Sequence, residues 1–236
     1  MDKATKLVLF DIDGTLLISK GIGRRSIKEA LISSYGTGGS IDTCDVGGRS
    51  YLEIVKDALS GTGVTNDQIT QKWVSFNQQV LDAFRKNLQE DQGLIVPLPG
   101  GIRLVNTLCD RPGMILGLIT GNPAGISWLK LKAAGYKKEQ FKINVFGDEA
   151  TTRSGLVTLA RQRAFRIYGN AFPGKQTIII GDTLKDVACA HQSNARSIIV
   201  LTGYDTQEIL KASRPDFIFN DLTDTESIEK ALFAPI

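Results

Sequence analysis

The 236-residue sequence has little of what marks secreted, membrane or disulfide-bonded proteins. Its 3 cysteines, Cys44, Cys109 and Cys189, are far apart and form no CxxC pair, so we expect reduced thiols. No signal peptide precedes the first predicted strand, and no apolar run is long enough to cross a bilayer. These absences predict a cytoplasmic protein with no membrane partner.

The sequence also lacks a dense run of basic residues. Its 28 Lys and Arg are scattered among 25 Asp and Glu, for a net charge of +3. We therefore expect no nucleic-acid partner, although a mild positive excess suits small anionic ligands. Nothing in the pattern indicates an oligomeric state.

Short apolar runs recur along the chain, and each ends in glycine or polar residues. They are nearly continuous rather than alternating, which is typical of strands covered on both faces of a parallel sheet. The predicted strands are 6–10, 114–119, 141–146, 176–180, 197–201 and 216–219. The predicted helices between them are at about 101–109, 123–134, 154–168, 184–192 and 205–212. This alternation predicts an α/β fold with a doubly wound, Rossmann-like parallel sheet.

One long segment, residues 18–96, interrupts this alternation and contains no convincing strand. Its clearest helix is 66–89, where large apolar residues recur at spacings of three or four, a pattern that predicts packing rather than cofactor binding. The segment ends in "GLIVPLPGG", a strong chain break. We expect a mobile helical cap domain at 18–96, and a core domain formed by 1–17 and 97–236.

Reactive side chains follow several of the predicted strands. Asp11 and Asp13 follow the first strand, Thr120 follows the second, and Asp182 with Asp186 follow the fourth. Because the carboxyl ends of parallel strands meet at one edge of a sheet, these groups are expected to gather there. Like charges held together at the end of a buried strand are costly unless they serve a purpose.

Three of these segments resemble the motifs of the haloacid dehalogenase superfamily of phosphohydrolases. "DIDGTLL" is similar to the first motif, DxDGT; "LITGN" to the second; and "IIIGDTLKDVACA" to the fourth, GDxxxD. The resemblance runs from residue 7 to about 221, and the inserted segment resembles the family's α-helical cap. The nearest subgroup is the phosphoglycolate phosphatase and β-phosphoglucomutase type.

The resemblance implies a role for each matching residue. Asp11 would be the nucleophile that forms an aspartyl-phosphate, and Asp13 the acid and base. The Asp11 carboxylate, the Asp13 main-chain carbonyl and Asp182 would bind Mg²⁺, with Asp186 supporting them. Oxygen ligands suit this cation, and without it these aspartates would repel one another. The Thr120 hydroxyl and nearby backbone N–H groups would bind phosphate oxygens. Gly14 would let the backbone turn close to the phosphate. The expected phosphate-binding residues here are Gly14, Thr120, Gly121 and Asn122.

The third motif departs from the family pattern, which normally supplies a lysine. Here the stretch is "GDEATTRSGLVTLA", and Arg153 takes roughly the expected place, where it would pair with the nucleophile and bind the phosphate. Lys142 and Lys175 are the alternatives. In the cap, Arg49 is the best candidate for contact with the far end of a substrate, because glycines precede it at a predicted loop–helix junction.

The function expected from these residues is Mg²⁺-dependent hydrolysis of a small phosphorylated metabolite through an aspartyl-phosphate. A phosphomutase of the β-phosphoglucomutase type would use the same core residues. A protein that binds a phosphorylated metabolite without turnover is a further alternative, which the arginine in the third motif leaves open.

Overall fold

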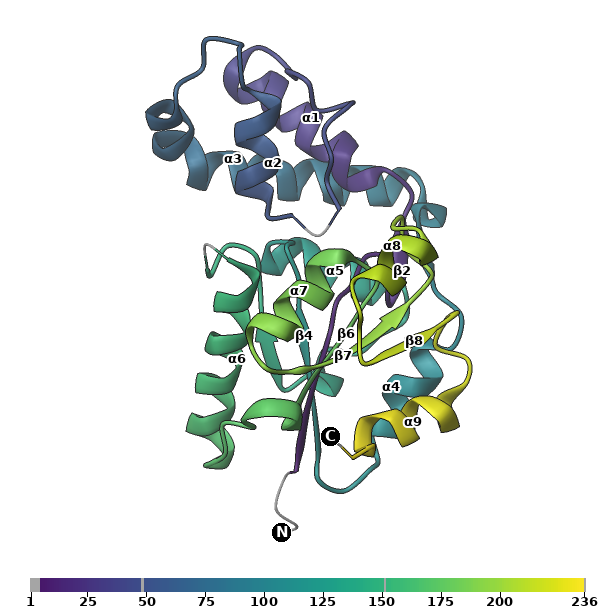
Figure 1. Cartoon of the computed structure of the whole chain (residues 1–236). Coiled ribbons are helices and arrows are strands. Elements are labelled where there is room, and N and C mark those ends of the chain that lie inside the picture. The colour runs from purple at the N-terminus through teal and green to yellow at the C-terminus, as the bar shows by residue number, and fades with distance from the viewer. Residues whose placement is uncertain (1–4, 48, 151, 236) are drawn as a thin grey trace.

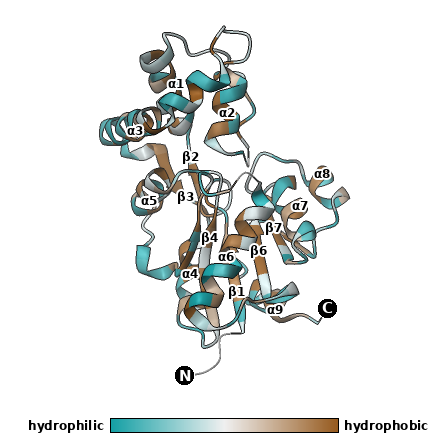
Figure 2. Cartoon of the chain, turned by 90° about the vertical axis from the view of Figure 1, so that its left-hand side faces the viewer, coloured by the Kyte–Doolittle hydropathy of each residue, from teal (hydrophilic) through white to brown (hydrophobic). Residues whose placement is uncertain are grey.

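A computed structural model describes residues 5–47, 49–150 and 152–235. Helices α1, α2 and α3 lie together at one end of the molecule, above a core that contains the large sheet (Figure 1). The strands of this core are among its most apolar segments (Figure 2).

The core is built on a sheet of six strands in the order β5-β4-β1-β6-β7-β8, and every neighbouring pair is parallel. The chain adds β4 and β5 on one side of β1 and then β6, β7 and β8 on the other. The predicted doubly wound parallel sheet is therefore confirmed. The strands are β1 (Lys6–Phe10), β4 (Met114–Ile119), β5 (Ile143–Val145), β6 (Thr177–Gly181), β7 (Arg196–Val200) and β8 (Phe217–Phe219).

Both faces of the sheet are covered by helices, and this explains the continuous apolar runs. In β1, Val8 and Phe10 join a buried cluster with residues of α4, α5 and α9, whereas Leu7 and Leu9 join one with residues of α6 and α7. Successive side chains of a strand point to opposite faces, so a strand buried on both faces needs apolar residues throughout. The core helices are α4 (Gly101–Cys109), α5 (Ala124–Ala133), α6 (Arg153–Tyr168), α7 (Leu184–Gln192), α8 (Gln207–Ala212) and α9 (Thr225–Phe233).

The inserted segment forms α1 (Ile22–Tyr35), α2 (Tyr51–Ala58) and α3 (Asn66–Glu90). Helix α3 begins with a capping box between Thr65 and Gln68, which satisfies backbone N–H groups at the helix start. Its apolar residues pack inward, and both Phe76 and Phe84 are completely buried. The aromatic stripe is therefore a packing face.

The expectation that residues 18–96 contain no strand is wrong at both ends of the segment. Strand β2 (Leu17–Ser19) pairs antiparallel with β3 (Ile95–Pro97), so the two chain connections between core and insertion run side by side. Each strand has only three residues, too few for a periodic pattern to show. Helix α9 was not predicted either, and β5 is shorter than the predicted 141–146. Within the described residues, no helix is both long and apolar enough to span a membrane.

Candidate active site

The candidate site lies at the carboxyl edge of the sheet, where the chain passes from one side of β1 to the other. Asp11 directly follows β1, Thr120 follows β4, and Asp182 follows β6. Strands β4 and β6 are the two neighbours of β1, so three consecutive strands of the sheet deliver these residues to one place. This is the position at which open parallel sheets bind ligands.

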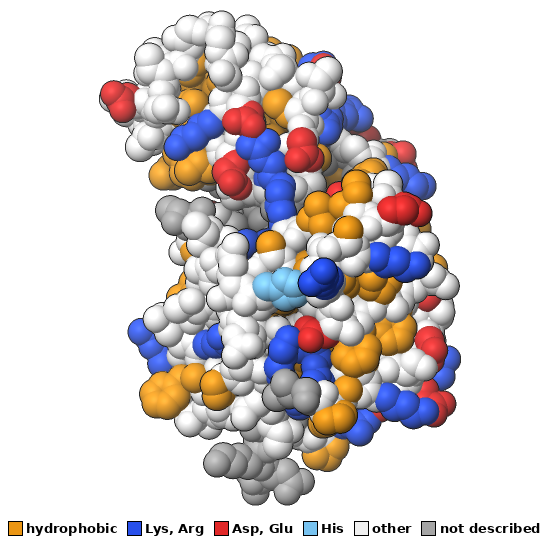
Figure 3. Space-filling model, in the orientation of Figure 1, with side chains coloured by type: hydrophobic (Ala, Val, Ile, Leu, Met, Phe, Trp, Pro, Cys, Tyr) orange, Lys and Arg blue, Asp and Glu red, His pale blue; other side chains and the backbone are white. Residues whose placement is uncertain are grey.

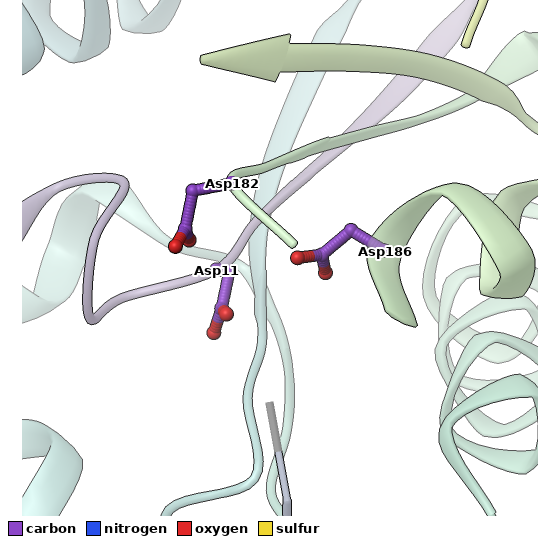
Figure 4. A group of neighbouring side chains, drawn as sticks. All are labelled: Asp11, Asp182 and Asp186. Atoms are coloured by element: carbon purple, nitrogen blue, oxygen red, sulfur yellow. The ribbon is translucent and has the colours of Figure 1, made fainter. Parts of the chain in front are cut away.

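Three buried carboxylates meet at this edge. Asp11, Asp182 and Asp186 each offer an oxygen within 4.8 Å of the others (Figure 4). Burial, with the Asp186 charge adding to it, raises the pKa of Asp11 to about 6 despite the opposing charge of Arg153. Burial and the neighbouring Asp11 also raise the pKa of Asp182. Buried oxygen ligands that repel one another are suited to a hard divalent cation such as Mg²⁺.

Arg153 supplies the positive charge in contact with this cluster. Its Nη2 lies 2.9 Å from Asp11 Oδ2 and also forms an ion pair with Asp186. The alternatives for the third motif lie elsewhere: Lys175 binds Asp216 at 2.8 Å, and Lys142 is exposed. Arg153 is thus the third-motif candidate that contacts Asp11.

Asp186 is held by its own helix as well as by Arg153. Its Oδ2 accepts hydrogen bonds from the backbone N–H and the hydroxyl of Thr183, which caps α7. The sequence predicted a supporting position for Asp186, and the structure places its carboxylate within the cluster itself.

The Asp13 carboxylate belongs to a separate hydrogen-bond network. Its Oδ1 accepts a hydrogen bond from Ser19, and its Oδ2 accepts bonds from Asn122 Nδ2 at 2.8 Å and Lys130 Nζ at 2.6 Å. Burial alone would raise the pKa of Asp13, but the Lys130 charge and these hydrogen bonds outweigh it and hold that pKa below its usual value. Asp13 is therefore ionised and fixed in orientation near neutral pH.

Sequence reasoning missed Lys130, which is only 3% exposed. Its Nζ also donates to Asn122 Oδ1 at 2.9 Å, so the ammonium joins two of the predicted site residues. A signal was present in the sequence, because Lys130 follows Ile126 by four residues on the buried face of α5. A lysine in that position requires a buried partner.

The predicted phosphate-binding residues follow β1 and β4, two neighbouring strands, and differ in their contacts. Thr120 is buried, and its Oγ1 accepts hydrogen bonds from Asn122. At Gly14, φ is +81°, and an added Cβ would lie 2.2 Å from the Asp182 carboxylate. Gly14 is therefore required by the close approach of Asp182. Gly121 faces the insertion, since a Cβ there would lie 2.3 Å from the Arg49 carbonyl oxygen.

A cavity of about 290 Å³ lies between the insertion and the core beside Arg153. Arg49 and Glu53 line it from the insertion, and Arg153 and Lys185 line it from the core. Basic and acidic side chains lie side by side where the two parts meet (Figure 3). Arg49 also pairs with Asp57 at 2.6 Å, which fixes its guanidinium at the cavity wall.

Comparison with known proteins relates this arrangement to a family. The model of HAD-hydrolase-like proteins matches residues 155–225. A phosphoglycolate phosphatase of Vibrio cholerae is 21% identical over 233 residues, which cover 93% of this chain and 95% of the relative. A hydrolase from Pseudomonas syringae superposes with a TM-score of 0.69 at 23% identity, covering 94% of this chain and 96% of that one. A predicted phosphoglycolate phosphatase from Haemophilus somnus has a TM-score of 0.69 at 22% identity, and the match covers 96% of this chain and 99% of that one.

The likeness to these solved structures extends over nearly the whole chain and includes the inserted helices. This likeness shows the fold. The family model over residues 155–225 and the relatives that match most of the chain make the chain similar to HAD-hydrolase-like proteins, among them phosphoglycolate phosphatases.

Proposed function

We propose that this protein is a Mg²⁺-dependent phosphatase that hydrolyses a small phosphate monoester through an aspartyl-phosphate on Asp11. The observation that carries the proposal is the buried cluster of Asp11, Asp182 and Asp186 with Arg153 in contact with it, next to the separately held Asp13. The relatives named phosphoglycolate phosphatase support a small anionic substrate.

The donor set fits a divalent cation. Asp11 and Asp182 offer carboxylate oxygens, and Asp13 would add its main-chain carbonyl. The cluster of Asp11, Asp182 and Asp186 carries three formal negative charges against the single positive charge of Arg153. A bound Mg²⁺ would neutralise phosphate oxygens and lower the repulsion between the phosphate and Asp11.

In the first step, an Asp11 carboxylate oxygen attacks phosphorus and the ester P–O bond breaks. The electron pair of that bond goes to the departing alcohol oxygen, which takes a proton from Asp13. Asp13 is ionised in the free site and takes up this proton from solvent as the dianionic phosphate binds, because the phosphate charge raises its proton affinity. Arg153 and the Thr120 hydroxyl hold phosphate oxygens as charge develops on them.

In the second step, Asp13 removes a proton from a water molecule whose oxygen attacks phosphorus. The Asp11–phosphorus bond breaks, and inorganic phosphate leaves with the carboxylate restored. The network of Ser19, Asn122 and Lys130 serves this step, because it keeps Asp13 in one position and returns it to the ionised form.

Phosphate release from a panel of phosphorylated metabolites, with and without Mg²⁺, tests the proposal. We expect Mg²⁺-dependent release that Asp11→Asn abolishes, and phosphate trapped on the wild-type protein by rapid acid quenching. Asp82→Asn serves as a control, because Asp82 is an exposed aspartate of α3 that pairs with Arg85 of the same helix. Conversion of a sugar phosphate into its isomer without phosphate release would instead identify a mutase, and binding without either reaction would identify a sensor.

A further inference from the structure

The Tyr51 side chain has a feature that the proposed chemistry does not explain. Tyr51 is the first residue of α2 and is only 6% exposed, yet its hydroxyl has no hydrogen-bond partner within the described part of the chain. Leaving a buried hydroxyl unpaired is unfavourable. A group kept in this state is a candidate for binding a ligand.

The Tyr51 hydroxyl lies near Lys130, the ammonium that contacts the proposed acid and base, Asp13. The position that a Cβ on Gly23 would occupy is 3.5 Å from this hydroxyl and 4.0 Å from Lys130 Nζ. Lys130 in turn contacts Asp13 at 2.6 Å. The charge of Asp13 also contributes, after burial, to a raised pKa of Tyr51. Tyr51 and Gly23 from the insertion therefore meet Lys130 and Asp13 from the core.

The two polar groups retain hydrogen-bonding capacity toward a ligand. The Lys130 ammonium has three N–H donors, and its hydrogen-bond partners in the described part of the chain are one oxygen each of Asp13 and Asn122. Its Nζ also lies 6.0 Å from the centroid of the Phe84 ring. The Tyr51 hydroxyl has its donor and acceptor positions free. The absence of a side chain at Gly23 leaves room beside them for one group the size of a methyl or a hydroxyl, since a Cβ there would be in ordinary contact with both.

We propose that the Tyr51 hydroxyl, the Lys130 ammonium and the space beside Gly23 bind the alcohol part of the substrate, and that they select an alcohol with a second hydroxyl close to the ester oxygen. The inference rests on the proposed function, in which Asp13 protonates the departing alcohol. Asp13 and Lys130 neutralise each other, so this subsite favours a neutral hydroxyl over a carboxylate, which would lie close to the Asp13 charge.

The test compares glycerol phosphate, which carries such hydroxyls, with ethyl phosphate, which lacks them, and with phosphoglycolate, which carries a carboxylate. The wild-type protein is expected to have its highest kcat/KM with glycerol phosphate. Tyr51→Phe should raise KM for glycerol phosphate by about 3- to 10-fold, the loss of one hydrogen bond, and by less for ethyl phosphate. Tyr35→Phe is the matched control, because it removes another buried, unpaired hydroxyl of the insertion.

Gly23→Ala tests the space itself. Its added methyl would lie in ordinary contact with Tyr51 and Lys130, so the fold should tolerate it, and alanine favours a helix more than glycine does. We expect a raised KM for glycerol phosphate with an undiminished melting temperature. A melting temperature that rises with no change in KM, for Gly23→Ala or Tyr51→Phe, would overturn the proposal.

Failure of the subsite and failure of the phosphatase proposal give different results. If no ester is hydrolysed, the phosphatase proposal fails. If all three esters are hydrolysed with equal kcat/KM, only the subsite fails. Calorimetric binding of glycerol phosphate to Asp11→Asn tests the subsite without turnover. A several-fold weaker Kd on adding Tyr51→Phe supports it, and an equal Kd overturns it.

Discussion

The carboxylate cluster predicts that Mg²⁺ stabilises this protein more at neutral than at acidic pH. The perturbation is the addition of Mg²⁺ at two pH values. The pKa of Asp11 rises from 3.8 to about 6 in the folded protein, so the folded state binds this proton more tightly than the unfolded chain does. Without a cation, stability therefore falls as the pH rises from about 4 to about 6, because ionisation becomes favourable in the unfolded chain first.

The size of the effect follows from that shift. Each pKa unit corresponds to about 1.4 kcal/mol, so ionising Asp11 in the folded protein costs about 3 kcal/mol at neutral pH. For a chain of 236 residues, this equals about 6 to 12 °C in melting temperature. The pKa of Asp182 is raised as well, which acts in the same direction. A cation bound between the carboxylates removes this cost, since it favours their ionised form.

Thermal unfolding with and without millimolar Mg²⁺, at about pH 5 and about pH 7.5, measures the prediction. We expect Mg²⁺ to raise the melting temperature by a large amount at the higher pH and by a small amount at the lower pH. Asp182→Asn should raise the melting temperature without Mg²⁺ at the higher pH, because it removes one of the repelling charges, and it should abolish the response to Mg²⁺. An equal response at both pH values, or a full response in Asp182→Asn, would refute the reasoning.

Further variants test single contacts. Arg153→Met should lower kcat by about 100-fold or more in steady-state assays. Arg153→Lys should retain part of the wild-type kcat, because the positive charge beside Asp11 matters more than the planar shape of the guanidinium. Lys130→Met should lower kcat and shift the acidic limb of the pH–rate profile upward, since Lys130 holds the pKa of Asp13 down; an unmoved limb would contradict this. Gly121→Ala should raise KM and increase the radius of gyration in small-angle scattering, because its Cβ would lie 2.3 Å from the Arg49 carbonyl oxygen and push the insertion away from the core. An unchanged KM and radius of gyration would exclude that contact.

Elements defined by continuous apolar runs or by strong helix signals were predicted closely. Strand β1 and helices α4 and α7 have the predicted bounds. Strands β2 and β3 were missed because three residues carry too little pattern, and their pairing joins Leu17 to Pro97 across the whole insertion. Helix α9 did carry a signal, since Asp224 caps it through the Ser227 N–H.

The site could be predicted as far as neighbouring strand ends determine it. The topology brings Asp11 and Asp182 together because β1 and β6 are adjacent, and both strands could be read from the sequence. The partners of Asp13 depend instead on how α5 and the insertion pack, and no local pattern encodes that. The spacing of Lys130 from Ile126 indicated a buried lysine but not its partner, and Tyr51 became visible only as a buried hydroxyl in the folded protein.

Charge balance explains why the two aspartates of the first motif have such different surroundings. Asp13 is paired one-to-one with Lys130, so its network is neutral and needs no ion. Asp11, Asp182 and Asp186 share Arg153, which leaves two uncompensated negative charges in a buried place. Such a deficit is tolerated only with a divalent cation or bound protons. In the proposed mechanism, the nucleophile is therefore in the half of the site that a divalent cation would neutralise, and the acid and base are in the half that is already neutral. Metal binding should consequently control the attack on phosphorus while leaving the position of Asp13 unchanged.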